Sequence, residues 1–135
     1  MSVRFTDNAI EVSQELLSSS REILESFARL TSAETKKNII RGTKTGETYN
    51  VPGTSVSYVA SSPGEAPANR TGNLASSYTS KVVSDEMSIV YSNAKYARIE
   101  FGFGNIAPRP ALRPASDKVM LNKRQIINAA VRNLR

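Results

Sequence analysis

The sequence contains no cysteine and no histidine among its 135 residues. Their absence excludes a thiolate nucleophile, a disulfide, a thiolate or imidazole metal site and an imidazole general base. Carboxylate chemistry, lysine chemistry and a Ser-Lys pair remain open. The chain also lacks a G-x-S-x-G elbow, a phosphate-binding loop and a carboxylate pair in an apolar setting. We therefore expect a protein that is not an enzyme and that has no cofactor and no metal site.

Long hydrophobic runs are missing as well. The unbroken apolar runs are only a few residues long, which excludes a membrane-spanning helix. The N-terminal segment from Met1 to Phe5 has no apolar stretch of the secretory type. We expect a cytoplasmically made protein without membrane contact. The length fits a single domain, residues 1–135, with one modest core.

The net charge of +6 is unevenly distributed along the chain. Residues 1–94 hold nine Lys or Arg and ten Asp or Glu, whereas residues 95–135 hold nine basic residues against Glu100 and Asp117. The last part therefore carries +7 and the rest −1. Such a basic segment attracts phosphate or complements an acidic protein neighbour. A solvated basic helix face is the third interpretation, and the three stay open.

Apolar periodicity predicts a long amphipathic helix from residue 7 to about residue 37. Asp7 is expected to cap its start, with Glu11 and Glu15 near the positive end of the helix dipole. An unbroken helix of about 28 residues is roughly 42 Å long, which exceeds what a compact domain of this size covers. Either the helix breaks near Thr31 and Ser32, or one end frays or projects toward a partner. The periodic positions are Ile10, Leu16, Leu17, Ile23, Leu24, Phe27 and Leu30.

A first β-hairpin is predicted next, with arms at residues 38–43 and 47–51 around the turn residues 44–46. The following segment, residues 52–72, is rich in Pro, Gly, Ser, Ala and Asn. A loop of about 20 residues in a small domain is usually functional or disordered. We interpret residues 52–72 as an interaction loop, with plain disorder as the alternative.

A short helix is predicted to begin around residues 71–74, followed by a second hairpin with arms at residues 80–83 and 87–92. Val82, Ile89 and Tyr91 are expected on the core face of this hairpin. The two hairpins are most simply combined into one antiparallel sheet, packed by the long N-terminal helix and a C-terminal helix. The predicted fold class is therefore α+β.

Three prolines lead into the predicted C-terminal helix, and Pro114 fits its first turn. Cations occupy faces of this helix away from its apolar stripe. The stripe residues are Val119, Ile126, Ala130 and Leu134, with Ile127 and Val131 beside them, and the cations are Lys123, Arg124, Arg132 and Arg135.

Four segments of the second half have the order and spacing of a known family. They read PGEAP at 63–67, TGNL at 71–74, YARIEFG at 96–102 and RPALRPA at 109–115. Together they resemble the tail-completion or head-tail joining proteins of long-tailed bacteriophages. The resemblance covers residue 61 to the end well, and the first 60 residues only by the order of elements. Many members have Thr after the Glu-x-Gly, where this chain has Phe103.

The resemblance implies a structural virion protein of the phage neck, at the head-tail interface. Such a subunit forms a ring, typically a hexamer, and its partners are the head-tail connector or adaptor protein and the tail tube protein. Nonspecific contact with passing DNA stays open. The residues expected at subunit or partner interfaces are Pro63, Gly64, Glu65, Pro67, Arg70, Gly72 and Leu74. The residues expected in a structural connector are Tyr96, Glu100, Gly102, Arg109, Pro110, Leu112 and Pro114.

Glu100 is a candidate for an ion pair because it is the only acid between Lys95 and Ser116. Arg109 or Arg113 would be its partner, and an exposed carboxylate of little energetic consequence is the alternative.

Two other functions compete with the tail-completion reading. A head-completion adaptor or a tail terminator shares the ring and the small size. From another class, a small basic DNA-binding protein would explain the +7 segment, although the sequence shows no helix-turn-helix or zinc module.

Overall fold

The structure is a computed structural model that describes the backbone of residues 2–132 and the side chains of residues 20–132. It confirms the α+β class, with a helix at each end of the described chain. The elements in order are α1 (Ser2–Arg41), β1 (Thr48–Asn50), β2 (Ser57–Val59), α2 (Asn73–Ser77), β3 (Tyr78–Ser84), β4 (Met87–Ser92), the 3₁₀ helix η1 (Lys95–Glu100), α3 (Leu112–Leu121) and α4 (Lys123–Arg132).

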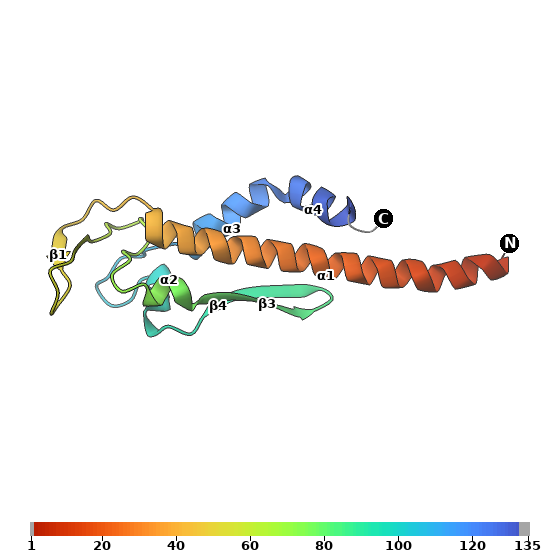
Figure 1. Ribbon diagram of the computed structural model, residues 1–135, viewed down its shortest axis with the longest axis horizontal. Helices are drawn as coiled ribbons and strands as arrows, with labels where there is room; N and C mark the ends of the chain where they lie inside the picture. The colour runs from red at the N-terminus through yellow and green to blue at the C-terminus, as the bar shows by residue number, and fades with distance from the viewer. Residues whose placement is uncertain (1, 133–135) are drawn as a thin grey trace.

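Helix α1 is one unbroken helix of 40 residues, about 60 Å long at 1.5 Å per residue. The expected break near Thr31 and Ser32 is wrong. Both residues are buried, and the hydroxyl of Thr35 donates to the carbonyl of Thr31 at 2.7 Å, so the helix buries polar side chains without interrupting its backbone. Its N-terminal turns extend beyond the hairpin β3–β4 and beyond α4 (Figure 1).

Two predictions about the ends of α1 are also corrected. The helix begins at Ser2, so Asp7 lies within it and does not cap its start. Residues 38–41 form its last turn and are not a strand. The β-branched pair Ile39 and Ile40 suggested an extended arm, but Ile39 is only 1% exposed in the core, and this packing outweighs the local strand propensity. The side chains of the predicted periodic positions before residue 20, and Leu134 and Arg135, lie outside the described residues.

The two hairpins form two separate two-stranded antiparallel sheets, where the sequence suggested one combined sheet. β1 pairs with β2, with Tyr49 opposite Tyr58. The first hairpin therefore starts later than predicted, and its second strand lies inside the segment 52–72 that was interpreted as a loop. The second hairpin pairs β3 with β4 much as predicted, but β3 begins two residues earlier, at Tyr78.

The register of β4 on β3 decides which face of this hairpin is buried, and it sets Val82 opposite Ser88 and Lys81 opposite Ile89. Tyr78 is only 3% exposed, and side chains alternate along a strand, so Val82 faces inward with Val90 of β4. Ile89 and Tyr91 lie on the opposite, exposed face, and their predicted place in the core is wrong. A change of one residue in strand parity exchanges the two faces completely.

Helix α1 forms the middle layer of the molecule. The hairpin β3–β4 and α2 lie on one side of it, and α3 and α4 lie on the other (Figure 1). The predicted C-terminal helix is divided into α3 and α4 at Asn122, and Pro114 occupies the first turn of α3 as predicted. The core is small and lies near the C-terminal end of α1. Its buried residues are Ile39, Ala75, Tyr78 and Ala111, with Ala66, Leu74, Val90 and Leu112 packed against them.

Candidate functional site

Glu100 joins η1 to the start of α3. Its carboxylate is 7% exposed and accepts hydrogen bonds from the backbone N–H groups of Ala111 at 2.7 Å, Leu112 at 3.0 Å and Arg113 at 2.8 Å. The first N–H groups of a helix have no partner within the helix, and Ala111 at the N-cap provides no side-chain cap. Glu100, which is 11 residues before Ala111 in the sequence, supplies this cap. Both expectations for Glu100, an ion pair with an arginine and an exposed carboxylate, are wrong.

Arg109 links the connector to the segment around residue 61. Its Nε donates to the hydroxyl of Ser61 at 3.1 Å, and its backbone N–H donates to the carbonyl of Ile99 at 2.8 Å. In the same region, the N–H of Gly64 donates to the carbonyl of Pro108 at 3.1 Å. Hydrogen bonds therefore join two segments whose bonded residues are 44 to 48 positions apart in sequence.

Gly102 lies in the turn that follows η1 and leads back to Arg109. Its φ is +78°, and a Cβ atom there would lie 2.7 Å from the carbonyl oxygen of Ile106. A side chain is therefore excluded both by the backbone conformation and by space. Among the other predicted connector residues, Pro110 is half-buried, Leu112 packs on the core, and Tyr96 is exposed.

The carboxylate of Glu65 is the acceptor of a second set of hydrogen bonds. It accepts from the N–H of Ser62 at 2.8 Å, from the N–H of Thr45 at 3.0 Å and from the hydroxyl of Thr45 at 2.6 Å. The bonds from Ser62 and Thr45 hold the pKa of this carboxyl below its ordinary value. Burial lowers the pKa of nearby Lys44, whose ammonium donates to the carbonyl of Asn38 in the last turn of α1 and to the carbonyl of Gly42 just after it. Glu65 thus joins two parts of the same chain, and its contact with a partner stays a prediction.

The predicted interface residues divide into an outer and an inner group. Pro63, Gly64 and Arg70 are exposed, and their contact with a partner stays a prediction. Pro67 is buried and Leu74 packs on the core. Gly72, with a φ of +80°, is the N-cap of α2 and confirms the predicted start of a short helix there.

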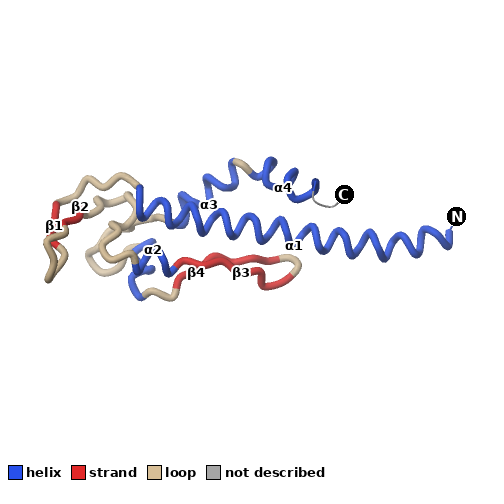
Figure 2. Tube along the Cα trace, in the orientation of Figure 1, coloured by secondary structure: helices blue, strands red, loops and turns tan. Residues whose placement is uncertain are grey.

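An arm of which the sequence indicated only the first strand, within the predicted range 47–51, projects from the end of the molecule where α1 finishes. It consists of β1, β2 and their turn, residues 47–60, and lies at the opposite end from the N-terminus of α1 (Figure 2). The rings of Tyr49 and Tyr58 pack at a centroid distance of 6.1 Å. Val56 and Val59 are exposed. The alternation of apolar and polar residues in TYNV and VSYVA was the signal available for these strands.

Large aromatic side chains are also exposed beside the connector. Phe101 is 81% exposed and Tyr96 is 71% exposed. Close by, the guanidinium of Arg98 lies 4.2 Å from the centroid of the Phe103 ring. Contiguous exposed apolar surface is typical of sites that contact another molecule.

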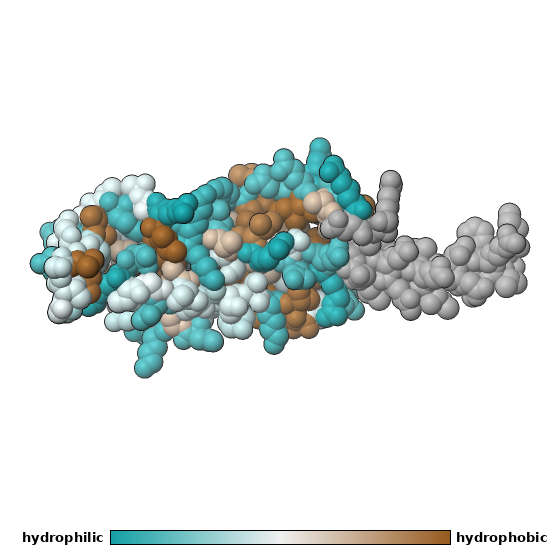
Figure 3. Space-filling model, viewed as in Figure 1, coloured by the Kyte–Doolittle hydropathy of each residue, from teal (hydrophilic) through white to brown (hydrophobic). Residues whose placement is uncertain are grey.

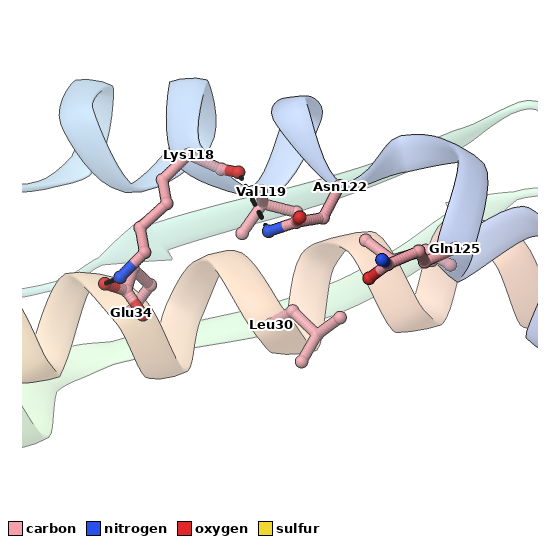
Figure 4. Close-up of a pocket in the computed structure, with 7 residues that line it drawn as sticks. Leu30, Glu34, Lys118, Val119, Asn122 and Gln125 are labelled. Carbon is pink, nitrogen blue, oxygen red and sulfur yellow. Dashed lines mark hydrogen bonds and ion pairs between the residues drawn. The ribbon is translucent and has the colours of Figure 1, made fainter.

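An open groove of about 310 Å³ lies between α1 and the helices α3 and α4 (Figure 4). The ammonium of Lys118 spans it and lies 2.7 Å from the carboxylate of Glu34. Its other lining residues are Leu30, Val119, Asn122, Gln125 and Ile126. Among the residues that the structure describes, no group of three or more carboxylates could hold a metal ion. Within this described part of the chain, none of the helices combines the length and the apolar character needed to cross a membrane.

In comparisons with known proteins, no family model matches this chain, and no curated protein or solved structure matches it significantly.

Proposed function

We propose that this chain is a ring-forming structural subunit of a bacteriophage neck, a tail-completion or head-tail joining protein that links the capsid connector to the tail tube. In this role it has no catalytic function. Two kinds of observation support the proposal. The sequence motifs support the position in the neck, and the exposed surface supports assembly into a larger structure.

The elongated shape is the main observation in favour of assembly into a larger structure. The chain exposes 9689 Å², whereas a compact monomer of 14.7 kDa is expected to expose about 6,900 Å². The difference reflects the elongated arrangement in Figure 1. A ring subunit makes two interfaces, one with each neighbour, and a standard interface removes about 800 Å² from each partner. An elongated subunit has the surface for both.

The resemblance motifs support the position in the neck because they occupy one structural unit. Glu100 caps the helix that the RPALRPA segment begins, and Arg109 of the same segment binds Ser61, two residues before the PGEAP segment. Segments with a shared structural task are expected to retain their order and spacing together. The arm lies directly beside this unit, because Glu65 bonds to Thr45 at its base.

The arm is suited to contact with a neighbouring protein. Its two strands are exposed, and each has a free edge that can pair with a further strand. Tyrosine at its surface supplies a large contact area with little loss of side-chain freedom. We place the contact with the tail tube or the connector at this end of the molecule.

The direct test is binding of the purified chain to tail tubes and to connectors of the phage that encodes it, measured by co-sedimentation. Binding to the tubes supports the tail-completion role. Binding to connectors alone would favour a head-completion adaptor. A matched variant, Tyr49→Ser, should weaken the binding by about tenfold or more, because it removes the exposed ring from the arm.

A DNA-binding function is the second candidate, because Lys123, Arg124 and Arg132 are all exposed on α4. A gel-shift assay at low and at physiological salt distinguishes it. Phosphate contacts alone weaken steeply as salt is raised. Tight binding that survives physiological salt, without binding to tail tubes, would replace the neck proposal by this one.

A further inference from the structure

The arm, residues 47–60, extends away from the rest of the molecule. Within the described chain, β1 and β2 pack on each other and have no extensive contact with any other helix or strand, and they lie beyond the end of α1 (Figure 2). The visible face of the arm carries hydrophobic residues among residues of intermediate hydropathy (Figure 3). The direction of the arm relative to α1 therefore depends on the two segments that lead into it and out of it, residues 42–46 and 61–65.

The segment that leaves the arm contains a tight turn, residues 62–65. The N–H of Glu65 donates to the carbonyl of Ser62 at 3.0 Å, and the φ of Gly64 is +86°. A turn with a positive φ at its third residue alone is of type II, which takes glycine at that position and commonly proline before it. Pro63 and Gly64 occupy these two positions, so the PGE sequence builds the turn that brings the Glu65 carboxylate to the base of the arm.

Both segments are held to the body of the molecule. On the leaving side, the N–H of Gly64 donates to the carbonyl of Pro108 at 3.1 Å, and Nε of Arg109 donates to the hydroxyl of Ser61 at 3.1 Å. On the entering side, the ammonium of Lys44 donates to two carbonyls at the end of α1 and just after it, at 3.2 and 3.1 Å. The arm thus has two separately anchored attachments.

Glu65 joins these two attachments to each other. Its Oε2 accepts from the N–H of Ser62 in the leaving segment and from the N–H of Thr45 in the entering segment, and its Oε1 accepts from the hydroxyl of Thr45. The next bond toward the arm is the one from the N–H of Gly46 to the carbonyl of Ala60, at 2.8 Å. The carboxylate therefore connects the two segments on the body side of the arm, with hydrogen bonds of the stronger, charge-assisted kind.

We propose that Glu65 is a positioning residue, which fixes the direction of the arm relative to α1 and so prepares the arm for its partner. A hairpin on two separate segments changes direction through a few backbone dihedrals in those segments, without losing its own hydrogen bonds. A bond between the segments removes this freedom. Glu65 acts through Thr45 and does not itself touch the partner. The contact with a partner rests on the proposed function, whereas the direction of the arm is a property of this chain alone.

Distances between two spin labels test the direction of the arm without a partner. The chain has no cysteine, so Ser55→Cys at the arm tip and Ala33→Cys on α1, both at exposed positions, carry the labels. Glu65→Ala removes all three hydrogen bonds to the carboxylate. The ratio of other arm directions to the native one should then rise about a hundredfold, a factor discounted for the access of water to this half-exposed site. Glu65→Gln, which retains one acceptor oxygen, should give a smaller rise.

Two controls show whether the change is confined to the direction of the arm. Glu86→Ala removes an exposed glutamate from the β3–β4 turn and should leave the distances unchanged. A label pair within the body, on Ala33→Cys and Lys81→Cys, should keep its distance in Glu65→Ala. Unchanged arm distances in Glu65→Ala, or an equal change in the body pair, would overturn the inference.

The arm itself should stay folded when the carboxylate is removed. Amide exchange at Tyr49 and Tyr58, which pair across the hairpin, should be the same in Glu65→Ala and in the unaltered chain. Loss of protection at these two residues would mean that Glu65 maintains the fold of the hairpin and not its direction, and the inference would be wrong.

The kinetics of binding to tail tubes separate positioning from direct contact. A change in the fraction of molecules that are competent to bind lowers the apparent affinity by that fraction, whereas the loss of a contact acts mostly on the dissociation rate. Glu65→Ala should therefore slow association by the factor by which the spin labels show the native direction to fall, and dissociation should not change. Tyr49→Ser should speed dissociation. Faster dissociation in Glu65→Ala with unchanged association would show that Glu65 touches the partner, against the inference.

These measurements also separate the inference from the proposed function. If the unaltered chain binds neither tail tubes nor connectors, the neck function is overturned, and the spin-label distances still decide whether Glu65 directs the arm. If the unaltered chain binds tail tubes and the distances in Glu65→Ala match those of the unaltered chain, the inference is overturned and the neck function stands.

Discussion

Removal of the Glu100 carboxylate should destabilise the whole domain. The change Glu100→Ala leaves three backbone N–H groups at the start of α3 without their acceptor. The N–H of Ala111 is buried, whereas those of Leu112 and Arg113 are partly buried and have better access to water. The three losses therefore differ in size.

The magnitude follows from these contacts. A buried donor that loses a charged acceptor costs about 2 kcal/mol, and the two donors with access to water cost about 0.5 kcal/mol each. With the favourable interaction between a carboxylate and the helix N-terminus, about 0.5 kcal/mol, the total is about 3.5 kcal/mol. For a domain of this size, the melting temperature should fall by about 14 °C. Glu100→Gln, which retains one acceptor oxygen, should lose about 2 kcal/mol.

Urea unfolding followed by circular dichroism measures these losses at constant pH. Glu86→Ala is the matched control, because Glu86 is an exposed glutamate in the β3–β4 turn. Its change should stay within about 0.5 kcal/mol. A loss below about 1 kcal/mol for Glu100→Ala, or an equal loss in the control, would refute the capping role.

Three further predictions concern single residues. Burial, with the charge of Glu100, raises the pKa of Tyr78 to about 12. The stabilisation from neutral Tyr78 is therefore complete below pH 10 and is lost as the pH rises from 10 to 12. In an alkaline titration, the tyrosinate absorbance that appears last should be missing in Tyr78→Phe. The pKa of Glu65 is lowered from its ordinary value of 4.5. The stabilisation from its ionised carboxylate is therefore present above pH 4.5 and is lost as the pH falls below that value. Glu65→Gln should speed amide exchange at Thr45 and Ser62 at neutral pH, with the difference from the unaltered chain disappearing in acid. Gly102→Ala should lower the free energy of unfolding, measured in urea, by about 2 to 3 kcal/mol. Gly104→Ala should lower it by about 1 kcal/mol, because a Cβ atom there meets open space.

Local signals in the sequence were sufficient for several elements. The second hairpin and the short helix after Gly72 were predicted because their turn and cap residues lie within or beside the elements themselves. Pro114 was placed correctly for the same reason, since a proline in the first turn loses no helical hydrogen bond. The α+β class followed from the order of these elements.

Other features depend on partners that are distant in sequence. Ile39 is helical because it packs in the core against residues from α2, β3 and the start of α3. Val82 was placed correctly, whereas Ile89 and Tyr91 were placed on the wrong face because the register of β4 on β3 decides which residues of β4 face inward with Val82. The sequence indicated a structural role for Glu100. Its role as the hydrogen-bond acceptor for backbone N–H groups depends on where α3 begins, and the sequence alone does not fix that position. The spacing of an acid and two arginines suggested an ion pair, whereas the backbone N–H groups are the actual partners.

The most direct test of the ring-forming function is the mass of the purified chain by light scattering over a series of concentrations, with negative-stain images of the same samples. We predict closed rings of about six subunits, in solution or after addition of tail tubes. A mass that stays at the 14.7 kDa of one chain at every concentration, without rings in the presence of tail tubes, would contradict the proposed function.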